Sequence, residues 1–427
     1  MIGQDIHNLA RRLWKINRSL TGEGVRETLS ILSQDLPSLE TKSYDSGSQV
    51  FDWTIPDEWE VKEAYIIDPL GNKICDFSVN NLHLVGYSTP INQKIPLTEL
   101  QKHLYSLPEQ PDAIPYITSY YKERWGFCIS HNAREDLIDG DYHVVIDSRH
   151  FKGVLNYGEL LIKGQSEKEI FISTYICHPS MANNELSGPT VVTYLAKWLL
   201  EQENLKYSYR IIFIPETIGS ISYLSQHYKL LKEKVYAGFN VSCVGDNRAY
   251  SYLPSRAGDT ISDDIAKHVL KWKDPNFISY TWNDRGSDER QYCAPGIDLP
   301  IATMMRTKYG EYPEYHTSLD DLETVVTPDG LQGGYDSLKL ALEAIEMNCK
   351  PKVKVLCEPQ LGKRGLYPTL STKGADTQVR LMMNFISYCD GEHTLLDIAD
   401  KVKSPIWGLY ELYEKLLEQG LIESNTV

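Results

Sequence analysis

Between about residues 150 and 350, short apolar runs alternate with stretches of helical periodicity. The runs at 169–176, 209–215 and 235–244 are largely apolar, so each suits a strand buried on both faces. Helical spacing follows the first run at 189–200. Strands of this kind, alternating with helices, predict an α/β fold whose mostly parallel, twisted sheet is flanked by helices.

The sequence before this core shows two different patterns, one helical and one typical of short strands. Apolar residues recur at helical spacing from 4 to 20, and a second helical stretch runs to 32. From 48 to 150, short runs separated by Pro, Gly and Asn are typical of a small β-rich unit. We therefore expect one core made of 1–47 and 151–350, with 48–150 as an inserted domain. An insertion near strand ends is expected to cover the site as a lid or side wall.

The last segment, 351–427, is predicted to be a separate domain. Three short helical stretches at 378–388, 394–402 and 407–419 precede a glycine stop and the start of a strand, which resembles a winged helix. From Asp376 to Val427, however, nine acidic residues stand against four basic ones. Such a surface repels phosphates, so we expect a packing or dimerisation module here, not a DNA-binding one.

Charge and composition narrow the class of protein. The formal net charge of −15 argues against nucleic acid as a partner, because binding a polyanion needs a basic surface. Nowhere do 18 uncharged apolar residues follow one another, so no membrane-spanning segment is expected. The eight cysteines are scattered singly, without a Cys-x-x-Cys pair, which favours reduced thiols and a cytoplasmic location.

Polar residues gather where the predicted strands end. Ligands of open α/β sheets bind beyond the carboxyl ends of the strands, where loops and helix N-termini converge. His178, Glu216 and Asp246 follow three predicted strands, and His316 lies in a later loop at 315–321 that is preceded by the polar stretch 286–290. A single histidine in a loop is more often structural than a ligand, so the order of these loops carries the argument.

That order resembles the co-catalytic zinc aminopeptidases. Their pattern is a strand-end histidine, an Ala-Asp-Asp-x-x-Ser-Gly loop, a Glu-Glu-x-Gly loop, an aspartate at a later strand end, and a final histidine. Here His178, the loop 182–188, Glu216 with its following residues, the strand end 240–242 and His316 match in the same order. The resemblance implies the zinc-exopeptidase fold for about 200 residues of core, and a general-base role for Glu216.

The whole chain is also similar to a bacterial family that has an aminopeptidase-like domain, an inserted β-domain and a C-terminal winged helix. Members are often encoded beside genes of polysaccharide biosynthesis. This resemblance rests on three phrases: FDWTIPDEW at 51–59, GSDERQYC at 286–293 and GKRGLYP at 362–368.

Three positions depart from the peptidase pattern. Asn183, Thr217 and Ser242 stand where the peptidases have acidic ligands. Two zinc ions about 3.5–4 Å apart need that negative charge to offset their repulsion, so we expect one divalent metal, zinc, per chain. Two imidazoles and one carboxylate form a normal catalytic zinc set. We expect His178, His316 and Asp246 as its ligands; the alternatives to Asp246 are Asp288, Glu289 and Glu185.

Each of the remaining polar residues has a possible functional role and a possible structural role. Glu216 either acts as the general base or only stabilises the N-terminus of the helix that follows it. Arg256 and Arg290, with Asp288 and Glu289, are candidate substrate-binding residues, and a guanidinium suits a carboxylate or phosphate. Pairing of these arginines with the chain's own acids is the competing interpretation.

Three functions follow from these observations. The first is a metal-dependent hydrolase of amide bonds, an aminopeptidase or a deacylase, acting on a peptide-like or small-molecule substrate. The second is a catalytically inactive peptidase fold that serves as a binding or assembly module, which the missing acidic ligands favour. The third is an acyltransferase or cyclase on the same fold. A homo-oligomer is compatible with each.

Overall fold

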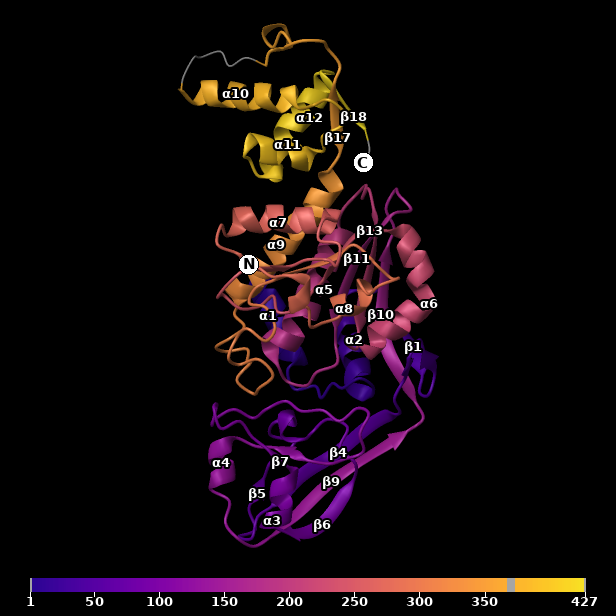
Figure 1. The fold of residues 1–427 in the computed structure, drawn as a ribbon, viewed down its shortest axis with the longest axis vertical. Helices are drawn as coiled ribbons and strands as arrows, with labels where there is room; N and C mark the ends of the chain where they lie inside the picture. Colours follow the sequence, from indigo (N-terminus) through magenta and orange to yellow (C-terminus); the bar gives the residue numbers. More distant parts are fainter. Residues whose placement is uncertain (1, 367–372, 426–427) are drawn as a thin grey trace. The chain divides into compact units, whose positions relative to one another are not determined.

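The computed structural model describes residues 2–366 and 373–425 (Figure 1). The chain divides into two compact units, one formed by 1–263 with 277–336 and the other by 264–276 with 337–427. Tyr367 and Pro368, which end the phrase GKRGLYP, lie outside the described residues.

A sheet of eight strands, counted within the described residues, forms the centre of the first unit. Its order is β1-β10-β12-β11-β13-β16-β14-β15. The middle strands β12, β11, β13 and β16 are parallel neighbours. β1 pairs antiparallel with β10, β10 with β12 and β14 with β16, whereas β15 pairs parallel with β14. The predicted α/β fold is thus confirmed, with a parallel centre inside a mixed sheet. The strands are β1 (Glu40–Asp45), β10 (Val154–Ile162), β11 (Glu169–Tyr175), β12 (Ser208–Ile214), β13 (Val235–Asn240), β14 (Ser251–Leu253), β15 (Ile278–Ser279) and β16 (Ile301–Met305).

The middle strands are apolar in sequence because their residues are buried on both faces of the sheet. Every residue of β11 and of β16 is buried, because helices cover the sheet. The helices of this unit include α1 (Ile2–Leu13), α2 (Glu23–Asp35), α5 (Ser187–Leu200), α6 (Ile218–Lys234) and α8 (Glu289–Tyr292), while α7 (Ile261–Lys273) and α9 (Pro328–Met347) each run from one unit into the other.

The first helix is shorter than its periodicity predicts. It ends at Leu13, although helical spacing continues to Leu20. The guanidinium of Arg18 donates a hydrogen bond to the carbonyl oxygen of Leu13 at 2.9 Å, so a side chain satisfies a backbone acceptor at the helix end. This turn carries Arg18 into the interior, where its side chain is fully buried.

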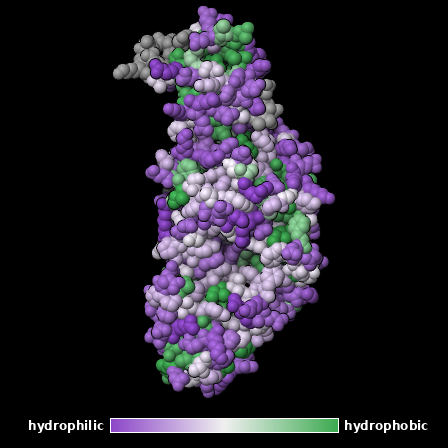
Figure 2. Space-filling view, in the orientation of Figure 1, coloured by the Kyte–Doolittle hydropathy of each residue, from purple (hydrophilic) through white to green (hydrophobic). Residues whose placement is uncertain are grey.

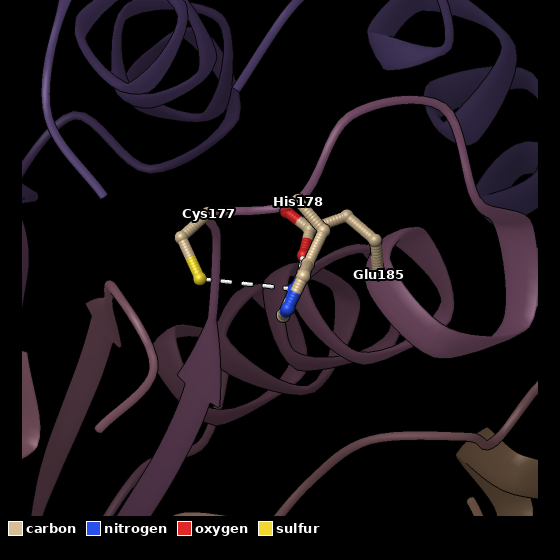
Figure 3. Close-up of side chains that lie close together, drawn as sticks. All are labelled: Cys177, His178 and Glu185. Atoms are coloured by element: carbon tan, nitrogen blue, oxygen red, sulfur yellow. Dashed lines mark hydrogen bonds and ion pairs between the residues drawn. The ribbon is translucent and has the colours of Figure 1, made fainter. Parts of the chain in front are cut away.

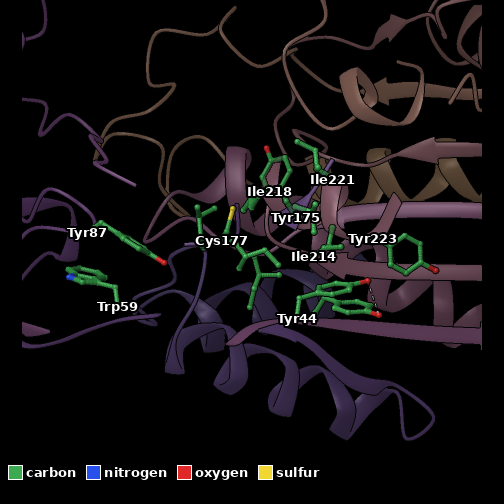
Figure 4. Close-up of a cluster of buried hydrophobic side chains, with 14 of the residues drawn as sticks. Tyr44, Trp59, Tyr87, Tyr175, Cys177, Ile214, Ile218, Ile221 and Tyr223 are labelled. Atoms are coloured by element: carbon green, nitrogen blue, oxygen red, sulfur yellow. Dashed lines mark hydrogen bonds between the residues drawn. The ribbon is translucent and has the colours of Figure 1, made fainter. Parts of the chain in front are cut away.

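A four-stranded antiparallel sheet, β5-β4-β9-β6, lies between β1 and β10 in the sequence. One cluster of buried side chains continues from this sheet into the core: Trp59 and Tyr87 come from the inserted region, and Tyr175 and Ile214 from β11 and β12 (Figure 4). The elements are β2 (Gln49–Val50), β3 (Trp53–Thr54), β4 (Glu58–Ile67), β5 (Lys73–Ile74), β6 (Ile91–Pro96), α3 (Leu97–Leu100), β7 (Leu104–Tyr105), β8 (Phe127–Cys128), α4 (His131–Glu135) and β9 (Asp141–Phe151).

The second unit carries α10 (Lys373–Ser387), α11 (Leu395–Val402), α12 (Tyr410–Glu418) and an antiparallel pair, β17 (Lys350–Val353) with β18 (Ile422–Asn425). Thr394 and Asp397 form a capping box at the start of α11, which explains the sharp onset of this helix. The three helices and the final strand agree with the predicted winged helix.

Hydrophilic residues cover most of the face seen in Figure 2, and the hydrophobic residues on it form small groups. Among the described helices, none has the length and apolar composition needed to cross a bilayer.

Candidate active site

Four loops bring the predicted site residues to one edge of the sheet. His178, Glu216 and Asp246 follow β11, β12 and β13, and His316 lies in the segment after β16. These four strands are parallel, so their carboxyl ends share an edge. The imidazole centroids of His178 and His316 lie 5.9 Å apart, although the residues are 138 positions apart in the sequence. The predicted proximity of the two histidines is confirmed.

His178 is held by a buried carboxylate. Its Nδ1 atom lies 2.9 Å from Oε2 of Glu185, and Oε1 of Glu185 accepts a hydrogen bond from Nε of Arg18 at 3.0 Å. The side chains of Arg18 and Glu185 are both 0% exposed, so this ion pair is withdrawn from water. Sγ of Cys177 lies 3.7 Å from the same nitrogen, Nδ1 (Figure 3). Burial lowers the pKa of His178, but Cys177 and Glu185 raise it by more, so the pKa lies well above its usual range.

Glu216 faces the free nitrogen of this imidazole. Its Oε2 atom lies 3.6 Å from Nε2 of His178, and its Oε1 accepts a hydrogen bond from the Ser287 hydroxyl at 2.8 Å. Burial raises the pKa of Glu216, and the charge of His178 opposes this shift. A carboxylate with a raised pKa whose side chain is still 22% exposed suits a proton-transfer role.

The residue after Glu216 is conformationally strained. Thr217 has φ 63° and ψ −78°, a backbone conformation that β-branched residues rarely adopt. Asp288 holds it there, because its Oδ1 accepts the Thr217 N–H at 2.7 Å, and Arg290 donates to the Thr217 hydroxyl at 3.1 Å. Burial and the nearby charge of Glu216 raise the pKa of Asp288 to about 7, and its Oδ2 has no hydrogen-bond partner among the described residues. Asp288 and Arg290 therefore lie at the site and fix the turn that presents Glu216.

The inserted region forms a wall of the site. The ring of Tyr116 makes edge contacts with His178 and His316, at centroid distances of 5.3 and 5.2 Å. Its backbone N–H donates to the carbonyl oxygen of His316 at 2.8 Å. Burial and the charge of His178 lower the pKa of His316 to about 3, so this imidazole is neutral at physiological pH. A neutral imidazole is the form that binds a metal.

Asp246 is occupied by hydrogen bonds of the chain itself. Its oxygens accept from the Asn183 amide at 3.0 Å, from the backbone and hydroxyl of Thr307 at 2.9 and 2.6 Å, and from the Arg248 N–H at 2.9 Å. Ligation by Asp246 would require several of these bonds to break. In this structure Asp246 holds Asn183 and Thr307, and its predicted role as a metal ligand stays a prediction.

Two of the predicted substrate-binding residues are likewise engaged elsewhere. Glu289 accepts from the Gly286 N–H at 2.8 Å and the Tyr309 hydroxyl at 2.6 Å, and its second oxygen accepts from the Asn240 amide at 3.1 Å. Arg256 pairs with Asp298 at an exposed position. For Arg256, the competing interpretation of internal pairing describes the structure.

Sequence reasoning missed three residues of this site: Arg18, Tyr116 and Asp320. Asp320 accepts the backbone N–H groups of Asn183 and Asn184 at 2.7 and 2.9 Å and so shapes the loop after His178. One sequence signal pointed to a cationic partner such as Arg18. Glu185 lies in an otherwise uncharged loop, and a buried carboxylate needs a positively charged or hydrogen-bonding partner. Tyr116 gave no such signal.

The residues can be tested for their fit to a metal. Within residues 2–366 and 373–425, one group of three possible ligands has all its ligand atoms within 4.8 Å, namely Cys177, His178 and Glu185. A cation there would lie beside the buried guanidinium of Arg18, and burial raises the pKa of the Cys177 thiol to about 11. The opposite nitrogen, Nε2, is better suited, because it faces Glu216 at 3.6 Å and the neutral ring of His316 lies 5.9 Å from that of His178. A histidine that donates Nδ1–H to a carboxylate and offers Nε2 is a common metal-ligand arrangement.

Comparisons with known proteins agree with this fold. A protein of Clostridium acetobutylicum, named "Putative polysaccharide biosynthesis protein with aminopeptidase-like domain", is 43% identical over 406 residues, covering 93% of this chain and 91% of that protein. The crystal structure of a "putative peptidase" from the same organism has a TM-score of 0.93 at 40% identity and covers 99% of this chain and 97% of that one.

More distant structures share the fold. A zinc aminopeptidase from Bacillus subtilis matches with a TM-score of 0.59 at 13% identity, over 80% of this chain and 94% of that one. Residues 349–424 match a model described as a winged helix-turn-helix. Residues 7–348 match the model described as a domain of unknown function (DUF4910), and the chain belongs to that family, with an aminopeptidase-like fold followed by a winged helix.

Proposed function

We propose that this protein is a metal-dependent hydrolase of amide bonds that uses one divalent metal ion, zinc, per chain. Its ligands are Nε2 of His178 and the imidazole of His316, and Glu216 is the general base. The proposal is supported by the fold shared with zinc aminopeptidases. The observation that carries it is the 3.6 Å approach of Glu216 Oε2 to His178 Nε2, while Glu185 fixes the other nitrogen.

The chain's own residues account for the proton transfers. Glu216 takes a proton from the water that attacks the amide carbonyl and then delivers it to the departing nitrogen, giving a carboxylate and an amine. The Ser287 hydroxyl orients the carboxylate of Glu216 through its hydrogen bond. A bound divalent ion would supply Lewis-acid polarisation of the carbonyl and of a water molecule. The pKa of His178 is raised, so binding a metal at Nε2 displaces a proton.

The substrate is a small molecule or a peptide-like conjugate. Asp288 and Arg290 hold the strained turn beside Glu216 and so act as positioning residues in this proposal. The name of the Clostridium acetobutylicum relative supports an amide on a sugar or amino-acid conjugate, the deacylase form of the proposal. All eight cysteines are free thiols, which supports a cytoplasmic location.

The test uses Glu216→Gln, which keeps the size and hydrogen-bonding of the side chain but removes the base. With a panel of aminoacyl and N-acetylated amides, we expect hydrolysis by the native protein. For the variant we expect a rate that is reduced by about 10²-fold or more at unchanged metal content. Glu201→Gln, at an exposed position, is the matched control. A variant as active as the native protein would remove Glu216 from the mechanism.

The second candidate is a non-catalytic binding module. Asn183 donates its amide to Asp246, where the peptidases place a bridging acid, and Tyr116 packs on both histidines. These contacts replace a metal pair by hydrogen bonds and an aromatic ring. A metal-free protein without amidase activity would favour this candidate.

A further inference from the structure

A pocket lies in the inserted region, and neither His178 nor His316 lines it. Its volume is about 410 Å³, within the range of small-molecule sites. It lies between the β2–β3 hairpin, the segment 119–123 and the end of β9. The residues that line it include Tyr87, Tyr120, Tyr121, Asp57, His150 and Lys152.

Aromatic rings are exposed at this pocket. Tyr121 lines it and is 57% exposed, and Trp53 contacts Tyr121 edge to face at 5.7 Å and is 40% exposed. Large aromatic side chains lose little conformational entropy on binding and are enriched where proteins recognise ligands. Two such rings left open to water beside a cavity indicate a surface that stacks against the apolar face of a ligand.

The positive and negative side chains that line the pocket are equal in number, so it carries no net charge. Lys152 pairs with Asp57 at 2.5 Å, and Lys122 and Glu123 add one charge of each sign. A phosphate or polyanion site would need an excess of positive charge. The pocket instead offers hydrogen-bond donors and acceptors beside aromatic faces, which suits a neutral, hydroxyl-rich ligand.

The floor of the pocket is a strained residue. Tyr87 is 2% exposed and has φ 64°, a conformation that is unusual for a bulky side chain. It is held by its stacking on Trp59 at 5.5 Å and by a hydrogen bond of its hydroxyl with Thr21 at 2.5 Å (Figure 4). Strain of this kind persists where surrounding structure enforces it, often at binding sites.

One wall is shared with the candidate active site. Tyr120 lines the pocket, and its hydroxyl lies 3.0 Å from that of Tyr116, whose ring contacts His178 and His316. A ligand in the pocket is therefore separated from the histidines by two tyrosines.

We propose that this pocket binds a neutral saccharide unit, which stacks on Tyr121 and Trp53 and hydrogen-bonds to the Asp57–Lys152 pair. The proposal goes beyond the hydrolase proposal and does not depend on it, because it needs neither metal nor turnover. Failure of the saccharide proposal therefore does not affect the hydrolase proposal, and the reverse also holds.

The experiment is a titration of the full chain, with chelator present, by the neutral sugars tri-N-acetylchitotriose and maltotriose. Calorimetry measures affinity. Because the chain has eight tryptophans, the contribution of Trp53 to the fluorescence change is taken from the difference between the native protein and Trp53→Ala. We expect saturable binding of at least one trisaccharide with a dissociation constant of about 1 mM or lower. Tyr121→Ala and Trp53→Ala should each weaken it about tenfold or more.

Phe51→Ala is the matched control. Phe51 and Trp53 belong to the same hairpin and neither lines the pocket, but Trp53 contacts the lining residue Tyr121, whereas Phe51, which is 52% exposed, contacts Tyr228. Phe51→Ala should bind as the native protein does. Circular dichroism verifies that each variant is folded. Absence of saturable binding by both sugars overturns the proposal, as does unchanged affinity in both Tyr121→Ala and Trp53→Ala. Tighter binding of glucose 6-phosphate than of either trisaccharide would also overturn it, by showing an anion site.

Discussion

The Nδ1 atom of His178 lies 2.9 Å from Oε2 of Glu185, and the same carboxylate holds the guanidinium of Arg18. All three residues are buried, and Arg18 also donates to the carbonyl oxygen of His178 at 2.9 Å. This network links the first helical segment to the end of β11 and fixes the imidazole so that Nε2 is turned toward Glu216. The proposed metal site therefore depends on residues that would not contact the ion.

Replacing Glu185 tests this dependence. Glu185→Gln leaves the buried Arg18 without a counterion, which we expect to cost about 3–5 kcal/mol in the free energy of unfolding. Arg18→Met combined with Glu185→Leu removes both charges and should restore much of that stability. In this double variant His178 lacks its orienting partner, so zinc affinity measured by competition with a chelator should fall about 10–100-fold. A double variant that binds zinc as well as the native protein would contradict the positioning role.

Asn183 offers a test of the charge argument. Asn183→Asp places a carboxylate where the amide now donates to Asp246 at 3.0 Å. We expect the chelator-treated variant to lose about 1–3 kcal/mol of stability, because a hydrogen bond becomes a repulsion. Added zinc should restore it, and Asn183→Asp with Thr217→Glu should bind a second ion. Asn247→Asp, at an exposed position, is the control. If the double variant still binds one ion, neutral ligands are not what limits occupancy.

A buried ion network away from the site predicts the response to acid. Burial raises the pKa of Glu159, but its bonds with Lys42, Tyr223 and Arg210 outweigh this and lower the pKa to about 2. The ordinary value is 4.5, so this contribution to stability is complete above pH 4.5 and is lost as the pH falls toward 2. Urea unfolding from pH 7 to 3 should show the decline. Glu159→Gln should flatten it, while the exposed Glu201→Gln should not; an unchanged slope in Glu159→Gln would exclude this network as its cause.

The sequence predicts the core elements well, because both of their faces are buried. The run at 169–176 corresponds to β11, that at 209–215 to β12, and the helix at 189–200 to α5, each within two residues. Local signals sufficed there. The start of α11 was equally clear, since Thr394 and Asp397 form its capping box within four residues.

The site was predictable only in part. His178, Glu216 and His316 were identifiable by their order along the chain, which strand ends then bring together. The pairing of Arg18 with Glu185 spans 167 positions, and Tyr116 reaches the histidines from within an insertion. Asp246 is a residue type that commonly binds metals, but in the structure its carboxylate accepts hydrogen bonds from Thr307. No local pattern encodes such contacts, because they depend on how distant segments pack.

The central claim is that Nε2 of His178 and the imidazole of His316 hold one divalent ion. The most direct measurement is elemental analysis of the zinc-saturated protein, combined with anomalous diffraction from its crystals. We predict one zinc per chain, at about 2.0–2.1 Å from Nε2 of His178 and from a nitrogen of His316, and its loss in a folded His178→Ala variant. A protein that takes up no zinc, or one that holds it at Nδ1 between Cys177 and Glu185, would contradict the account.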